Sequence, residues 1–219
     1  MLKKIFKTFA LLIIIGVVLL MSFRIYTVNH YPPAAEGIIP TDALKTAYAA
    51  GTLDAETWEA RTLYDDHQKS KFFSHQPIYI PSAETLIVTL RYNNSLLAIM
   101  AEDFGFAETS GRDLPLDVSL FADGHERIHP STYTFTTAFG LYSYRRYVFE
   151  GVSADMLDTL YIDVYYADNA DYTASPYASL ELRDASREPE VYKLTAADKK
   201  ALTEYRASTL NDILSAKKF

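Results

Sequence analysis

The chain has 219 residues, of which 28 are acidic and 21 are basic, and its formal net charge is −7. It has no cysteine, which excludes disulfides, thiolate metal ligands, cysteine nucleophiles and a lipid-modified cysteine anchor. Four basic residues precede the first acidic one, Glu36, so the rest of the chain holds 17 basic and 28 acidic residues, a net charge of about −11 that argues against nucleic acid as a partner.

An uncharged apolar run occupies residues 8–23, directly after three lysines in residues 1–7. Apolar positions continue to residue 28, and the side chain of Arg24 can reach the headgroup region, so the sequence predicts a transmembrane helix over residues 8–28. Lysines beside a spanning segment favour the cytoplasmic side. We therefore expect residues 1–7 to form a short cytoplasmic segment, and the C-terminal domain of this single-pass chain to lie outside the cell membrane.

The residues after this run distinguish a retained anchor from a cleaved signal peptide. Residues 20–26 include large side chains where a signal peptidase needs small ones, and Ala34-Ala35 lies too far downstream. We therefore expect a permanent signal-anchor, with a cleaved signal peptide and a buried helix of a soluble protein as the alternatives. Three prolines in residues 29–40 predict a stiff, Pro-rich spacer after the anchor.

The next stretch, residues 41–75, is predicted to be a small helical segment. Thr41 or Asp42 can cap a first helix that ends near Gly51, and Asp54 can cap a second one. The second helix would contain three large side chains, Trp58, Leu63 and Tyr64. We expect this segment to pack on the main domain.

From residue 76 onward the hydrophobic period changes to two. The even-numbered positions from Leu86 to Tyr92 are apolar, and Asn93-Asn94 then gives a turn signal. Seven segments of this kind are predicted as strands: residues 85–92, 116–121, 132–139, 142–152, 160–166, 177–183 and 191–194. Residues 76–195 are therefore expected to form a mainly β domain, an antiparallel β-sandwich or open barrel, and most simply an immunoglobulin-like sandwich of about seven strands.

Residues 196–219 are predicted to form an amphipathic C-terminal helix. Thr195 and Asp198 have the spacing of a capping box variant at its start. Apolar side chains then recur at helical spacing, at Leu202, Tyr205, Leu210 and Ile213. Their face would dock on the chain's own sheets or bind a partner.

One motif has the pattern of a catalytic site. His125-Glu126-Arg127-Ile128-His129 matches the His-Glu-x-x-His pattern of zinc metallopeptidases, and Glu150 follows at the distance of a third ligand. The chemistry requires both histidines on one helical turn. A turn signal at Asp123-Gly124 precedes the motif and Pro130 follows it, so we expect no helix here. His125, His129 and Glu150 therefore remain an alternative metal site only.

Tyrosine and arginine are concentrated in two of the predicted strands. These side chains supply rigid contact area when exposed, so they are candidates for a ligand or partner surface: Tyr142, Tyr144, Arg145, Arg146, Tyr147, Tyr161 and Tyr165. The alternative is ordinary sheet packing, since tyrosine is common in strands.

The sequence indicates no catalytic residue and no cofactor. Asp163, Asp168 and Asp171 lie close together, but the ordered spacing of a calcium loop is missing. We expect a membrane-anchored protein, held by residues 8–28, whose extracytoplasmic domain is a non-enzymatic binding or accessory module for a surface protein or glycan. The alternative is a tethered extracytoplasmic hydrolase, the zinc metallopeptidase considered above.

Overall fold

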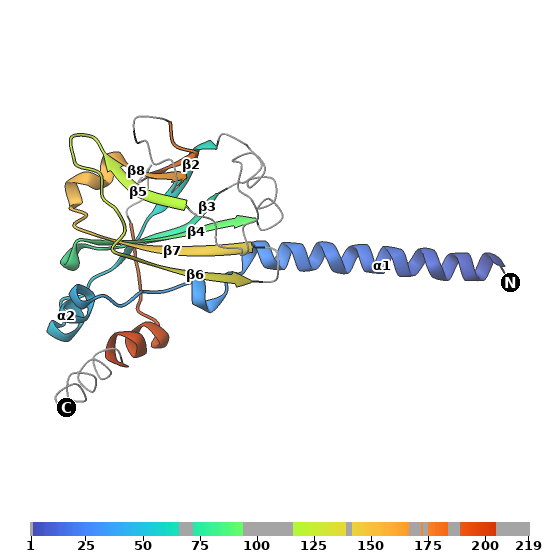
Figure 1. The fold of residues 1–219 in the computed structure, drawn as a ribbon. Helices are drawn as coiled ribbons and strands as arrows, with labels where there is room; N and C mark the ends of the chain where they lie inside the picture. The colour runs from blue at the N-terminus through green and yellow to red at the C-terminus, as the bar shows by residue number, and fades with distance from the viewer. Residues whose placement is uncertain are drawn as a thin grey trace, which may run out of the picture. The chain divides into compact units, whose positions relative to one another are not determined.

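The structure is a computed structural model that describes residues 2–65, 72–93, 116–138, 142–166, 172, 175–183 and 189–204 (Figure 1). The chain divides into two units, Met1–Glu36 and Gly37–Phe219. The first unit is mainly helical, and the second holds the sheets.

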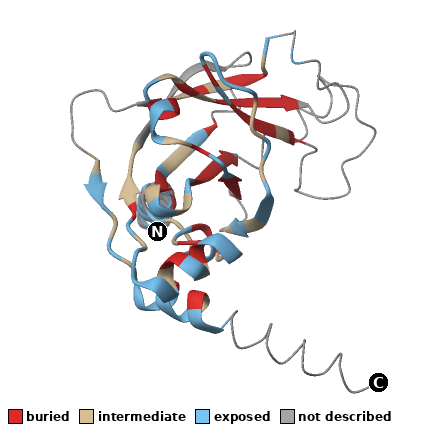
Figure 2. Cartoon of the chain, turned by 90° about the vertical axis from the view of Figure 1, so that its left-hand side faces the viewer, coloured by how far each residue is buried: buried red, intermediate tan, exposed pale blue. Residues whose placement is uncertain are grey.

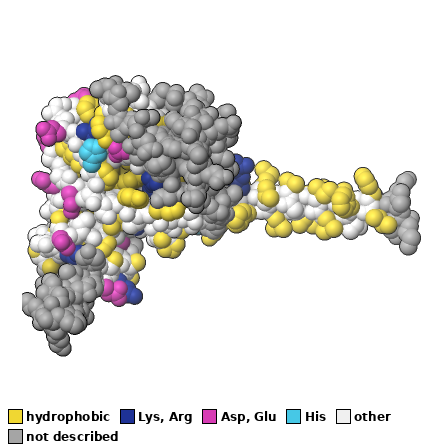
Figure 3. Space-filling view, viewed as in Figure 1, with side chains coloured by type: hydrophobic (Ala, Val, Ile, Leu, Met, Phe, Trp, Pro, Cys, Tyr) yellow, Lys and Arg dark blue, Asp and Glu magenta, His cyan; other side chains and the backbone are white. Residues whose placement is uncertain are grey.

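The first unit consists of helix α1 (Leu2–Asn29) and a short 3-10 turn, η1 (Pro33–Ala35). Within α1, the 23 residues Ile5–Thr27 are long and apolar enough to cross a membrane. At a rise of about 1.5 Å per residue they span roughly 34 Å, which exceeds a hydrocarbon core of about 30 Å. The helix continues through Arg24, so the candidate span is longer than its uncharged run. Its large apolar side chains are exposed, as the hydrophobic surface along α1 in Figure 3 shows.

The second unit begins with helix α2 (Asp42–Ala50). The Thr41 hydroxyl caps it by accepting a hydrogen bond from the Leu44 N–H at 3.3 Å, and Gly51 ends it with a left-handed φ of 71°. The first helix predicted between residues 41 and 51 is therefore confirmed.

The second predicted helix is wrong. Its residues lie in strands β1 (Glu56–Thr57) and β2 (Glu59–Asp65), and β3 (Phe73–Ile80) follows. Apolar residues in this short stretch have helical spacing, but β2 pairs antiparallel with a strand more than 100 residues away in sequence. Their register runs from Glu59 opposite Arg183 to Asp65 opposite Ala178. Such a long-range ladder overrides local propensity.

Two antiparallel sheets form the second unit, and the prediction of a mainly β, antiparallel fold is confirmed. One sheet has six strands in the order β10-β1-β3-β4-β7-β6, and the other has four in the order β2-β9-β8-β5. The remaining strands are β4 (Thr85–Asn93), β5 (Leu116–Ala122), β6 (Thr132–Ala138), β7 (Tyr142–Glu150), β8 (Leu160–Tyr166), β9 (Ala178–Arg183) and β10 (Glu190–Val191). Two 3-10 turns, η2 (Pro81–Ala83) and η4 (Ala154–Thr159), connect strands β3 to β4 and β7 to β8.

The six-stranded sheet buries side chains on both of its faces. Leu86 and Val88 of β4 belong to a core cluster that also contains Val118 and Ile162 from the four-stranded sheet. Ile87, which points to the opposite face, belongs to a second cluster with residues from outside the sheets. Buried residues are accordingly concentrated on the strands in Figure 2. Full burial of each such side chain stabilises the fold by about 1.5–3 kcal/mol.

The C-terminal segment is helical over residues 196–204. The predicted capping box is present, because the Asp198 N–H donates to Thr195 Oγ1 at 3.1 Å and the Thr195 N–H donates to Asp198 Oδ2 at 2.8 Å. Leu202 is buried in the second core cluster beside Leu44 of α2, so the described part of this helix docks on the chain's own domain. Tyr205 and the apolar positions after it lie outside the described residues.

Candidate functional site

The outer face of the four-stranded sheet carries a set of polar and aromatic side chains. Val118 and Leu120 of β5 point into the core. Their neighbours therefore point to the other face, as does the matching set on β8. The register places three such pairs directly opposite each other: Asp117 and Tyr165, Ser119 and Asp163, and Phe121 and Tyr161.

Arg127, from the segment after β5, lies at the centre of this face. Its guanidinium Nη1 donates to Asp163 Oδ2 at 3.0 Å and to Ser119 Oγ at 2.8 Å. Nη2 donates to the Tyr165 hydroxyl at 3.4 Å. The second carboxylate oxygen of the buried Asp163 accepts from Ser179 Oγ of β9 at 2.7 Å. Both oxygens of Asp163 therefore have partners, and its charge is balanced by Arg127.

Three aromatic rings surround the same guanidinium. The Cζ atom of Arg127 lies 5.3 Å from the ring centroid of Phe121, 5.2 Å from that of Tyr165 and 5.0 Å from that of Tyr172. These are cation–π distances. The rings of Tyr165 and Tyr172 pack edge to face, with centroids 5.2 Å apart. We call this group the Arg127 cluster, and its members are Ser119, Phe121, Arg127, Asp163, Tyr165 and Tyr172.

The rim of the Arg127 cluster adds a carboxylate and an imidazole. The Tyr172 hydroxyl donates to Asp117 Oδ2. Burial, and then this hydrogen bond to a carboxylate, raise the pKa of Tyr172 to about 12, so the phenol stays protonated at physiological pH. His129 contacts both partners, with Nδ1 3.7 Å from Asp117 Oδ1 and its ring 5.5 Å from the ring of Tyr172.

The exposed part of the Arg127 cluster is aromatic. Phe121 is 36% exposed and Tyr172 is 38% exposed, while Tyr165 beneath them is buried. The cluster therefore presents two fixed rings above a neutralised arginine. Such a face suits non-covalent contact, because its acid and base groups are already engaged with one another.

The His-Glu-x-x-His segment is not helical. Ile128 forms an isolated antiparallel bridge with Leu120 of β5, in which each N–H donates to the other's carbonyl, at 3.0 and 2.8 Å. Ile128 is thus held at the edge of β5, whereas His125 lies in a bend that closes the turn after β5, with its N–H donating to the Ala122 carbonyl at 3.1 Å. The two histidines therefore do not lie on one helical turn, which is the arrangement that brings both imidazoles of this motif to one zinc ion.

The two histidines of this motif also contact different carboxylates. His125 Nε2 lies 3.6 Å from Asp155 Oδ2 in η4, whereas His129 faces Asp117 of β5. A hydrogen bond with the Ser153 side chain, and further the charge of His125, hold the pKa of Asp155 below its ordinary value. Glu150, the third alternative ligand, is exposed at the end of β7. In the described part of the chain, no three His, Asp or Glu side chains come together to hold a metal ion.

Most of the tyrosines and arginines predicted as a partner surface are buried. Tyr144, Arg145, Arg146 and Tyr147 belong to β7, which lies between β4 and β6 and is covered on both faces. Tyr165 is also buried, and only Tyr142 and Tyr161 are partly exposed. These seven residues therefore do not form one exposed face, because core clusters cover both faces of β7.

The two buried arginines of β7 point to opposite faces. Arg145 donates from Nη1 to the Leu116 carbonyl at 3.4 Å and to the Tyr147 hydroxyl at 3.3 Å. Its guanidinium lies 5.4 Å from the ring centroid of Tyr133. Arg146 donates from Nη2 to the Gly37 carbonyl. Both arginines are therefore structural, because their hydrogen bonds join β7 to the backbone at Leu116 and Gly37.

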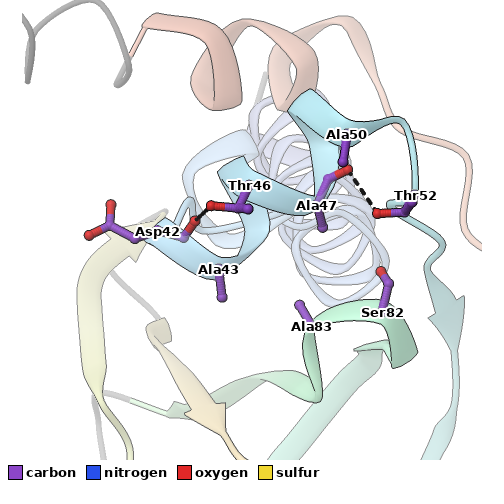
Figure 4. Close-up of a pocket in the computed structure, with 8 residues that line it drawn as sticks. All are labelled: Asp42, Ala43, Thr46, Ala47, Ala50, Thr52, Ser82 and Ala83. Atoms are coloured by element: carbon purple, nitrogen blue, oxygen red, sulfur yellow. Dashed lines mark hydrogen bonds between the residues drawn. The ribbon is translucent and has the colours of Figure 1, made fainter.

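A hollow of about 480 Å³ lies between α2 and η2 (Figure 4). It is lined by small side chains and one acid: Asp42, Ala43, Thr46, Ala47, Ala50, Thr52, Ser82 and Ala83. The hydroxyls of Thr46 and Thr52 donate to backbone carbonyls of α2, at 2.8 and 3.3 Å. The lining therefore offers mainly methyl groups, and it has no arrangement of acid, base or nucleophile.

The sequence pointed to His125 and His129 but missed Arg127 between them. The signal that was available is the alternation of β8, which places Asp163 outward between two tyrosines and so requires a cation nearby. Comparison of the chain with family models, with curated proteins and with solved structures gives no match. Function is therefore inferred from the Arg127 cluster and from α1.

Proposed function

We propose that this chain is a single-pass membrane protein whose extracytoplasmic domain is a non-enzymatic binding module for a protein at the cell surface. Helix α1 is the anchor, residues 1–7 lie in the cytoplasm and the two sheets form an immunoglobulin-like sandwich outside the cell. A core cluster that takes side chains from both sheets supports the sandwich. The lysines before the apolar run support the orientation.

The observation that carries the binding role is the rigid aromatic face of the Arg127 cluster. Phe121 and Tyr172 are partly exposed, yet the guanidinium of Arg127 holds both rings from beneath. Tyrosine and arginine dominate the energetics of protein interfaces, and a surface that is already ordered loses little entropy on binding. The rim groups Asp117 and His129 supply hydrogen-bond partners beside the rings. This combination favours recognition over catalysis.

The orientation can be tested with single cysteines, since the chain has none. Asp123→Cys lies in the exposed turn after β5, and Lys3→Cys lies in the predicted cytoplasmic segment. A membrane-impermeant maleimide should label Asp123→Cys on intact cells, and label Lys3→Cys only after permeabilisation. The reverse labelling pattern would overturn the orientation. Release into the medium of the domain that carries Asp123→Cys would overturn the anchor.

The binding role can be tested by purification of the full chain from solubilised membranes. Wild-type protein should retain one surface protein reproducibly, and Tyr172→Ala should lose it. Val191→Ala is the matched control, because Val191 is a 77% exposed apolar residue on β10. Retention of the partner by Tyr172→Ala would exclude the Arg127 cluster as the site. Binding of cell-wall glycan instead of protein, or hydrolysis of wall or peptide substrates, would overturn the proposed class.

A further inference from the structure

Strand β6 forms one edge of the six-stranded sheet. It pairs with β7 over its whole length, from Thr132 opposite Val148 to Ala138 opposite Tyr142, without a register shift. Within the described residues, no strand pairs with its other side. The opposite edge of this sheet, β10, is only two residues long. Among the described strands, β6 is therefore the long edge of this sheet with a neighbour on one side only, and every second N–H and C=O along it points away from β7.

The sequence and register of β6 lack the charges, prolines and bulges that usually prevent edge strands from pairing. Its seven residues, Thr-Tyr-Thr-Phe-Thr-Thr-Ala, include no charge, no proline and no glycine, and the strand has no bulge. By contrast, the edge of β5 in the other sheet is bridged by Ile128. Thr132, Thr134 and Thr137 are exposed, and Tyr133 is 50% exposed. Threonine, tyrosine and phenylalanine all favour strands, so β6 is suited to accept another one.

We propose that the added strand is β6 of a second copy, so that two chains join their six-stranded sheets edge to edge about a two-fold axis. Antiparallel pairing centred on Phe135 places Thr134 opposite Thr136 of the second copy. It also places Tyr133 opposite Thr137, so every facing pair is uncharged, and all but the terminal pair of Thr132 with Ala138 consist of β-favouring residues. The part of the chain beyond Arg24 carries a net charge of about −11, and two such domains repel each other. The uncharged β6 edge is where they can approach.

The membrane supplies the rest of the stability of this dimer. Seven residues per copy are fewer than the roughly 20–30 per partner of a standard stable interface, so this pairing is weak between free domains. Two chains anchored in one bilayer meet at a much higher effective concentration. The strength of the dimer thus rests on the anchoring role proposed for α1, whereas its geometry rests on β6 alone.

The test uses single cysteines in the full, cysteine-free chain in its native membrane, with a short bifunctional maleimide. In this register like positions of the two copies at residue 134, or at residue 136, are offset by two residues, so their Cα atoms lie about 8 Å apart, within reach of the reagent. We expect Thr134→Cys and Thr136→Cys to give crosslinked dimer at roughly ten times the yield of Thr46→Cys, an exposed position on α2. Equal crosslinking yields at all three positions would overturn the proposal. Labelling of Asp123→Cys on intact cells tests the anchoring role of α1 separately, so failure of the dimer and failure of the anchor can be told apart.

A blocking variant makes the result specific to strand pairing. Lysine on an edge strand prevents the addition of another strand. Thr134→Lys, in the chain that carries Thr136→Cys, should therefore reduce the dimer roughly tenfold, whereas Thr46→Lys should leave it unchanged. The melting temperature of each variant shows whether the fold is intact. Insensitivity of the dimer to Thr134→Lys, or crosslinking of β6 to a different protein, would overturn the second copy as occupant.

Discussion

The carboxylate of Asp198 accepts a hydrogen bond from the backbone N–H of Ile38 at 2.8 Å, although 160 residues separate them. The same carboxylate accepts from the Tyr192 hydroxyl at 2.8 Å and from the Thr195 hydroxyl at 2.7 Å. Asp198 is buried, so one acidic side chain joins the start of the second unit to its C-terminal helix. Burial raises the pKa of Asp198, but the hydrogen bonds from Ile38 and Thr195 outweigh it and hold the pKa below the usual value.

Asp198→Asn should lower the free energy of unfolding by about 2 kcal/mol at pH 7, because the amide loses the charge that these donors stabilise. The folded pKa of Asp198 lies below the unfolded value of 3.8. Its contribution is therefore complete above the unfolded pKa and is lost as the pH falls through the folded pKa. The gap between wild type and variant should close below about pH 4. Urea unfolding of the full chain in detergent, followed by the fluorescence of its single tryptophan, Trp58, measures this gap.

Asp123→Asn is the control for this pH dependence. Asp123 is exposed in the turn after β5, so its substitution should change stability by less than about 0.5 kcal/mol at every pH. A gap between wild type and Asp198→Asn that persists unchanged at pH 3 would contradict the role of the carboxylate charge.

Gly37→Ala should destabilise the second unit strongly. Gly37 has a φ of +82°, and a Cβ built there would overlap Asp198 Oδ1. Gly151 has nearly the same φ, +80°, but nothing lies within 4 Å of its Cβ position. Gly151→Ala should therefore cost only the backbone strain, about 1 kcal/mol, and Gly37→Ala about 3 kcal/mol. Equal losses in urea unfolding would show that Asp198 moves aside without cost.

Arg127→Ala should destabilise the four-stranded sheet by about 2–3 kcal/mol, because it leaves the buried Asp163 without its cation. Arg127→Lys keeps a charge but loses the planar fork that contacts Asp163, Ser119 and Tyr165 together, so it should cost about 1 kcal/mol. Urea unfolding at low and high salt distinguishes the two variants. Equal losses for alanine and lysine would mean that the geometry of the guanidinium matters more than its charge.

Local patterns predicted much of the fold. The two-residue period identified β4, and the capping box identified the start of the C-terminal helix, because both signals involve neighbours in sequence. The second helix failed for the opposite reason. Strand β2 exists because β9 offers it a ladder, and no signal within residues 59–65 reports a partner at residues 178–183.

The candidate site shows the same limit. Tyr161 and Tyr165 were correctly placed on the aromatic face of β8, but the tyrosines and arginines of β7 were expected to be exposed. A sequence does not show that core packing covers both faces of β7, with Tyr147 in one cluster and Val148 in the other. The residues around Arg127 match the His-Glu-x-x-His pattern, in which Arg127 itself has no role. Its role in the structure depends on Asp163, 36 residues away in sequence.

Zinc should not bind this chain through His125 and His129. The two imidazoles do not share a helical turn and contact Asp155 and Asp117 respectively, so forming the helical turn that brings them to one ion would require breaking the bridge between Ile128 and Leu120. Calorimetric titration of the full chain with zinc should give no 1:1 binding of micromolar or tighter affinity. His125→Ala should change stability by less than about 0.5 kcal/mol, since its contact with the exposed Asp155 is a surface ion pair. Tight stoichiometric binding that His125→Ala abolishes would instead restore the metallopeptidase hypothesis, because it would mean that this segment can form the helical turn the metal needs.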